Sequence, residues 1–135
     1  MYKNILVPVS FDSNRDTGHA IEVARRLGGD DATYTVLHAI EPLPGYYSAY
    51  LPQDALTINR TKVKEDLEAV AKTCDGAKTE VVDGRSGHEI VRWAHDNKVD
   101  CIVIASHEPT LSDFVLGSTA QYVVRHAKCA VHVIH

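Results

Sequence analysis

The sequence predicts an α/β fold: a five-stranded parallel sheet with helices on both faces, of the Rossmann-like class. Five short runs of β-branched and apolar residues alternate with four segments of helical periodicity. The resulting order, β-α-β-α-β-α-β-α-β, favours parallel strands joined by right-handed crossovers. The length of 135 residues suits one domain spanning 1–135.

The predicted strands are the apolar runs ILVPV at 5–9, YTVLHAI at 34–40, EVV at 80–82, CIVIA at 101–105 and CAVHVI at 129–134. The first and fourth are almost continuously apolar, which is typical of strands covered on both faces. We therefore expect these two strands in the middle of the sheet. The last run is short and is expected at an edge, where a second copy of the chain could pair with it.

The first two helices follow from apolar stripes. Residues 16–27 place Ala20, Ile21, Ala24 and Leu27 on one face, and Gly28-Gly29 provides a stop signal. Residues 59–74 repeat this pattern with Val63, Leu67, Val70 and Cys74. Each helix is expected to bury one face against the sheet.

Two further helices are expected to begin at Ser86 and Ser118. Ser86 with Glu89, and Ser118 with Gln121, have the spacing of a capping box, in which side chains satisfy the free N–H groups of a helix start. Apolar residues follow at helical spacing in both segments, and the second continues to Ala127.

The connection 41–58 is long and carries three of the five prolines and three of the six tyrosines. One interpretation is a surface excursion with a short helix near 52–58. The alternative is a lid or a partner contact, because connections of this length are uncommon unless they are functional or partly helical.

The composition disfavours several classes of protein. The net charge is −4, so no basic face for nucleic acid is indicated. No apolar stretch approaches the roughly 20 residues of a membrane span, and the start MYKNILVPVS lacks the features of a signal peptide. Three widely spaced cysteines disfavour a disulfide framework. A cytoplasmic protein without membrane insertion is expected.

Ligands of open parallel sheets bind beyond the carboxyl ends of the strands. The candidate strand ends are therefore 8–12, 39–41 and 105–109. In Gly117-Ser118-Thr119 the glycine directly precedes a predicted helix, whose first N–H groups can bind an anion such as phosphate. The alternative is an ordinary turn followed by an N-cap.

Three stretches, KNILVPVSFDS, VLHAIEP and CIVIASHEPTLSDFVLGSTAQYVVRHAKCAVHVIH, resemble the universal stress protein family, in particular its short single-domain bacterial members. The resemblance runs nearly end to end. It implies a sheet of the adenine nucleotide alpha-hydrolase type, pairing into a homodimer through the last strand, and binding of ATP or ADP. The family's nucleotide loop is G-x2-G-x9-G-[ST].

The resemblance implies a nucleotide site formed by Pro8, Val9, Ser10, Asp12, Ala39, Ile40, Ala105, Ser106, His107, Pro109, Gly117, Ser118 and Thr119. Gly117 and Ser118 match the final G-[ST] of the loop. Ala105 and Glu108 stand where the first two glycines are expected, within an SHxP variant of the loop. Asp12 could hold Mg²⁺ through water, and it could replace the aspartate that relatives carry at the position of Ser10.

These residues leave three functions in competition. The first is an adenine-nucleotide-binding module for stress response or signalling that acts as a dimer. The second is a weak Mg-dependent ATPase, at most slow because no Walker GxxxxGK[ST] loop is present. The third is a dimeric interaction protein that does not bind nucleotide, which Glu108 and Ser10 favour.

The remaining histidines are interpreted as surface residues rather than metal ligands. His88 and His95 are seven residues apart on a predicted helix and can share a face, but no further ligand converges on them. His126, His132 and His135 are expected near the dimer edge. No catalytic residue is assigned.

Overall fold

A computed structural model of the chain describes residues 1–10, 15–42, 55–106 and 116–134. The elements along the chain are β1 (Asn4–Pro8), α1 (Arg15–Gly28), β2 (Thr33–Ile40), α3 (Ala55–Lys72), β3 (Lys78–Asp83), α4 (Ser86–Asp96), β4 (Cys101–Ala105), α5 (Ser118–His126) and β5 (Ala130–Ile134). The predicted alternation of strand and helix is confirmed.

The five strands form one parallel sheet in the order β3-β2-β1-β4-β5. β1 is the central strand and β4 lies beside it, so the prediction from their continuous apolar runs is confirmed. β5 is an edge strand, as expected. Its register aligns Cys101 with Ala130 and Ala105 with Ile134.

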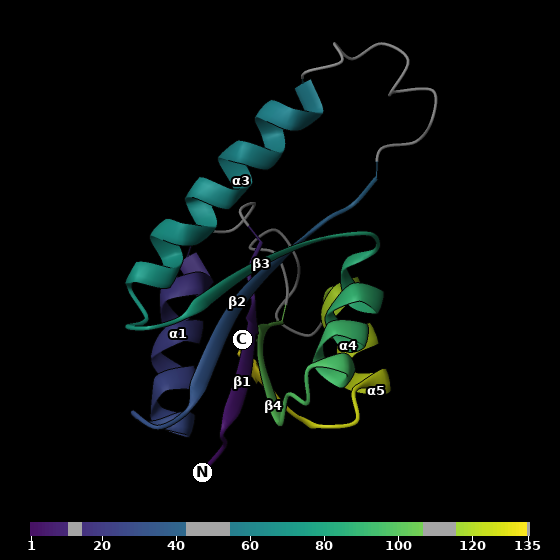
Figure 1. Ribbon diagram of the computed structural model, residues 1–135. Helices are drawn as coiled ribbons and strands as arrows, with labels where there is room; N and C mark the ends of the chain where they lie inside the picture. The colour runs from purple at the N-terminus through teal and green to yellow at the C-terminus, as the bar shows by residue number, and fades with distance from the viewer. Residues whose placement is uncertain (11–14, 43–54, 107–115, 135) are drawn as a thin grey trace.

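Helices cover both faces of the sheet, with α1 and α3 on one side and α4 and α5 on the other (Figure 1). Successive side chains of a strand point to opposite faces. Ile5 and Val7 therefore pack with α1 and α3, whereas Leu6 packs with α4 and α5. All three side chains are fully buried.

The first helix ends as predicted. α1 stops at Gly28, and the Gly29 N–H donates to the carbonyl of Arg25 at 2.8 Å. Gly29 has a φ of +76°, a conformation that glycine adopts at little cost. In the interpretation of 41–58 as a surface excursion, a short helix was expected near 52–58. Residues 55–58 are helical, but they form the start of α3 rather than a separate element. No helix in the described ranges is long and apolar enough to cross a bilayer.

The capping box predicted at the start of α4 is wrong. The N-cap is Arg85, and no side chain of α4 caps the helix. The N–H and Oγ of Ser86 instead donate to Oε1 of Glu41, at 3.2 and 3.0 Å. A carboxylate from the end of β2 therefore supplies the acceptor at this helix start.

The capping box predicted for α5 is also wrong. Its N-cap is Gly117, without a side-chain cap. The side chain of Gln121 donates from Nε2 to the carbonyl of Leu116 at 2.8 Å, so it does not reach back to Ser118.

The thiol of Cys101 is expected to make the fold less stable at alkaline pH. Burial, reinforced by the nearby Cys129 and Asp100, raises the pKa of Cys101 from 9.0 to about 11. Above pH 9 the unfolded chain releases this proton while the folded chain keeps it. The stabilisation is therefore complete below pH 9 and is lost between pH 9 and 11, by about 2 kcal/mol.

Urea unfolding followed by the fluorescence of Trp93, the only tryptophan, measures this loss. Cys101→Ala is the control, because it removes the titrating group. Its free energy of unfolding should decline less from pH 9 to 11 than that of the wild type. Equal declines would contradict the assignment to Cys101.

Candidate functional site

The strand order reverses between β1 and β4. From β1 the chain builds outward through β2 and β3, and it then crosses to the opposite side to add β4 and β5. A crevice opens outside the carboxyl ends of the strands at such a switch point. The ends of β1 and β4 are therefore the place at which a ligand site is expected.

The end of β1 is held in place by β2. The N–H of Val9 donates to the carbonyl of Leu37 at 2.8 Å, which extends the strand pairing one residue past Pro8. Nδ1 of His38 lies 2.8 Å from the carbonyl oxygen of Val9. Because a carbonyl oxygen can only accept, Nδ1 carries the proton in this hydrogen bond. Ser10 follows and is exposed.

His38 was missed as a site-forming residue in the sequence. The available signal was a polar side chain in the otherwise apolar run VLHAI, close to the carboxyl end of a strand. Its partner, Val9, comes from a different strand, and sequence spacing does not identify that contact.

The structure brings the end of β4 together with the start of α5. Ser106 is buried, its N–H donates to the carbonyl of Ile134 at 2.7 Å, and its own carbonyl accepts from the N–H of Gly117 at 2.6 Å. The two ends of the connection between residues 106 and 117 are therefore joined. Ser106, which follows Ala105 at the end of β4, therefore lies beside Gly117.

The first turn of α5 presents backbone donors. The first helical hydrogen bond runs from the N–H of Gln121 to the carbonyl of Gly117 at 2.9 Å. The N–H groups of Ser118 and Thr119 come before it and have no acceptor within the helix. Such donors, together with the positive end of the helix dipole, favour an anion.

The backbone conformation of Gly117 does not require glycine. Its φ of −61° and ψ of 158° are extended values that any residue adopts, and its N–H is already bonded to Ser106.

The other predicted site residues divide into two groups. Ala39 and Ile40 lie half-buried at the end of β2, with β1 between them and β4. Asp12, His107 and Pro109 lie outside the described residues, as does Glu108. Within the described part of the chain, no three His, Cys, Asp or Glu side chains are placed to hold a metal ion.

Polar contacts also connect residues at the carboxyl ends of β2 and β3. Arg60 of α3 donates from Nη1 to both carboxylate oxygens of Asp83, at 2.7 and 2.9 Å. Glu41 accepts from Ser86, and the N–H of Gly84 donates to the carbonyl of Ile40 at 2.9 Å. Sequence analysis missed these contacts because most of the partners are far apart in the chain.

We expect Glu41→Ala to lower the free energy of unfolding by about 1 kcal/mol, because it removes the acceptor at the start of α4. Urea unfolding measures the change. Glu65→Ala, at an exposed position of α3, is the matched control and should stay within about 0.5 kcal/mol of the wild type. Equal losses in both variants would exclude Glu41 as the cap of α4.

Comparisons with known proteins agree with this architecture. A model of the universal stress protein family matches residues 1–135. Over 144 aligned residues the chain is 31% identical to Universal stress protein G of Escherichia coli O157:H7, with 99% of each protein covered.

Two solved structures share the fold. The universal stress protein UspA from Lactobacillus plantarum superposes with a TM-score of 0.72 and 28% identity, covering 99% of this chain and 98% of that one. The universal stress protein from Archaeoglobus fulgidus, solved in complex with dAMP, gives a TM-score of 0.66 at 21% identity and covers 99% and 98% of the two chains.

Proposed function

Because the chain belongs to the universal stress protein family, we propose that it binds an adenine nucleotide beyond the ends of β1 and β4 and acts as a nucleotide-dependent binding module. The observation that carries this proposal is the start of α5, where a glycine bonded to Ser106 is followed by N–H groups that have no acceptor within the helix. The dAMP complex of the Archaeoglobus fulgidus protein supports the class of ligand.

In this proposal, the phosphates of ATP or ADP bind at Gly117, Ser118 and Thr119. Ala105 and Ser106 form the adjoining wall, and His107 and Pro109 belong to the same loop. Two backbone N–H groups and two hydroxyls are suitable donors for phosphate oxygens. A nucleotide that binds only the native state also raises the free energy of unfolding.

The adenine and ribose lie toward β1 and β2, where we assign Pro8, Val9, Ser10, Asp12, Ala39 and Ile40. The hydrogen bond of His38 to Val9 holds this strand end in position. Asp12 is assigned to Mg²⁺ bound with the nucleotide, because carboxylate oxygens suit this ion. Binding rather than turnover is proposed, since the sequence contains no Walker loop.

We also propose that the chain forms a homodimer through β5. This strand has β4 on one side only among the described strands, so its outer edge offers N–H and C=O groups to a second strand. Val131 and Val133 are half-buried, so part of each side chain is accessible to a second copy of the chain. Sedimentation at micromolar concentration should give a dimer, and a monomer would contradict this assignment.

The direct test of nucleotide binding is mass spectrometry of the small molecules released when the freshly purified protein is denatured. Calorimetric titration with ATP, ADP and AMP, with and without Mg²⁺, complements it. We expect an adenine nucleotide in near-stoichiometric amount or saturable binding in the titration. A protein that is empty and fails to bind in titration would favour the dimeric interaction protein instead.

A further inference from the structure

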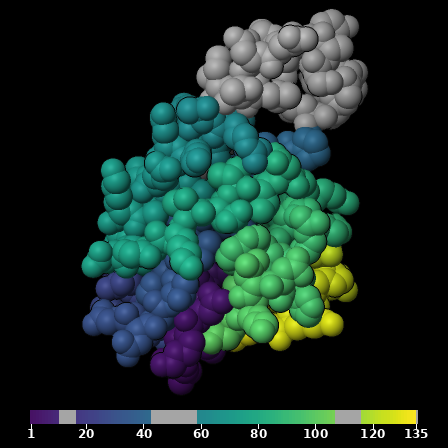
Figure 2. Space-filling model, viewed as in Figure 1, coloured from purple at the N-terminus to yellow at the C-terminus, as the bar shows by residue number. Residues whose placement is uncertain are grey.

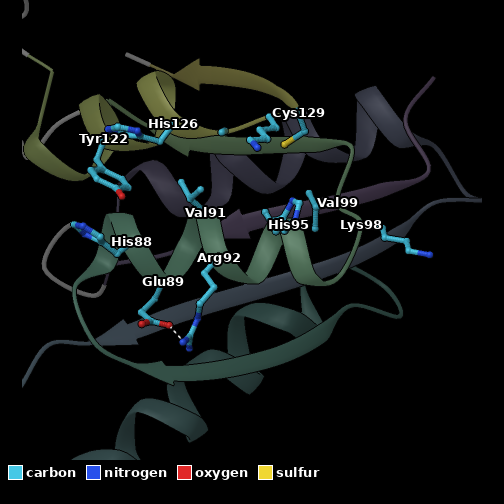
Figure 3. Close-up of a pocket in the computed structure, with 13 residues that line it drawn as sticks. His88, Glu89, Val91, Arg92, His95, Lys98, Val99, Tyr122, His126 and Cys129 are labelled. Atoms are coloured by element: carbon cyan, nitrogen blue, oxygen red, sulfur yellow. Dashed lines mark ion pairs between the residues drawn. The ribbon is translucent and has the colours of Figure 1, made fainter.

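A groove runs between α4 and α5, and none of its lining residues is assigned to the proposed nucleotide site (Figure 3). Its volume is about 780 Å³, within the range of roughly 300–1,000 Å³ for sites that hold small ligands. Its lining comes from both helices and the segments that follow them: His88, Glu89, Val91, Arg92, Ala94, His95, Lys98, Val99, Tyr122, His126, Ala127, Lys128 and Cys129. In Figure 2, residues of α4 and of the last part of the chain adjoin at one side of the molecule.

Three neighbouring rings line one end of this groove: His88 stacks on Tyr122, and His126 is tilted against it. Tyr122 lies between the two imidazoles, with ring centroids 4.1 Å from His88 and 4.2 Å from His126. A Cβ on Gly87 would come within 2.8 Å of Tyr122, so the glycine allows the helices to approach closely. His126 lines the groove from the last residue of α5, and His132 lies on β5.

The mouth of the groove carries positive charge. Three of the chain's 14 Lys and Arg residues line it, against one of its 18 acidic residues. That acid, Glu89, has a side chain only 15% exposed, and its Oε2 lies 2.6 Å from Nη2 of Arg92, which is 67% exposed. Lys98 and Lys128 are exposed. The accessible charges of the groove are therefore cationic, although the chain as a whole carries −4.

Between these cations the groove is lined by apolar side chains. Val99 and Ala94 are buried, and Val91, Ala127 and Cys129 are half-buried. The surface therefore combines apolar contact area with charged groups at its rim, which is the usual anatomy of a protein interface.

We propose that this groove binds an acidic peptide segment of a partner protein. The carboxylates of the segment pair with Arg92, Lys98 and Lys128, and its interspersed apolar side chains pack on the lining between the helices. α4 contains 11 residues and is about 16 Å long, which matches roughly five residues of extended chain. The proposal does not depend on nucleotide binding.

A labelled synthetic peptide tests this proposal. The probe is a fluorescein-labelled peptide of about eight residues that alternates glutamate and leucine, and its binding is followed by fluorescence anisotropy. One comparison peptide replaces glutamate with lysine, and another replaces leucine with serine. We expect only the glutamate-leucine peptide to bind, and its affinity should fall as salt rises.

Charge reversal at the rim identifies the surface. Lys98→Asp combined with Lys128→Glu should raise the Kd at least about tenfold. Aspartate is chosen at residue 98 because Lys98 has a φ of +57°, which aspartate tolerates. The matched control, Lys62→Glu with Lys72→Glu, makes the same charge change at exposed positions of α3 and should leave the Kd unchanged.

Several outcomes would overturn the proposal. They are an equal effect of the two double variants, equal binding of the lysine peptide, and no binding of the glutamate-leucine peptide. Tighter binding of labelled oligothymidylate than of that peptide would indicate nucleic acid and would also overturn it. Amide chemical-shift changes on titration with the peptide should be confined to α4, α5 and the residues after them; changes elsewhere would argue against this site.

Discussion

Gly117→Val should abolish nucleotide binding while leaving the fold and self-association intact. The backbone of Gly117 is extended, so valine is accommodated without strain at this position, and the hydrogen bond from its N–H to Ser106 can persist. The new side chain stands beside the N–H groups of Ser118 and Thr119, where the phosphates are proposed to bind. Calorimetric titration with ATP should show a Kd raised at least about a hundredfold, or about 2.7 kcal/mol.

Two measurements separate this effect from damage to the fold. Urea unfolding and sedimentation of Gly117→Val should match the wild type. Ala69→Val places the same β-branched side chain at an exposed position of α3 and should bind ATP like the wild type. Undiminished affinity of Gly117→Val for ATP would show that phosphates do not bind at the start of α5.

The largest loss of stability is expected from Ile102→Ala. Ile102 is fully buried in β4 and packs with residues of α4 and α5. Truncation removes its apolar contacts and leaves a cavity that the surrounding strands and helices fill only in part. We expect a loss of about 3 to 4 kcal/mol in the free energy of unfolding, which is a large share of a typical domain's stability.

Urea unfolding monitored by Trp93 fluorescence measures this loss. Val124→Ala is the matched control, because it truncates an aliphatic side chain that is 44% exposed on α5. It should change the free energy of unfolding by no more than about 0.5 kcal/mol. A similar change in the two variants would mean that burial at Ile102 does not determine its contribution.

Much of the fold could be predicted because its signals are local. The continuous apolar runs containing Ile5 and Ile102 identified the strands that lie inside the sheet, and Gly28-Gly29 identified the end of α1. The capping box of α4 failed because the competing partner of Ser86 is Glu41, 45 residues away, and that of α5 failed because Gln121 bonds to the carbonyl of Leu116 instead. The first failure has a general reason. Local spacing cannot register an acceptor that the fold itself supplies.

The same distinction applies to the two candidate sites. Gly117 precedes a helix in the sequence, so a candidate anion site was visible there, but its bond to Ser106 was not. His88 and His95 were expected to share a helix face, and both line the groove. The second wall, with Tyr122 and His126, comes from another helix and required the packing of α4 against α5.

The hydrogen bond between Ser106 and Gly117 affects how the sequence between them can change during evolution. β5 and α5 hold its two residues, so the distance that the chain between them must close is set by elements outside it. Doubling the length of a flexible connection raises the free energy of closing it by only about 0.6 kcal/mol. Insertions and substitutions between 107 and 116 can therefore accumulate while the protein still folds. If the nucleotide binds as proposed, this connection is where ligand preference can be changed without redesigning the scaffold.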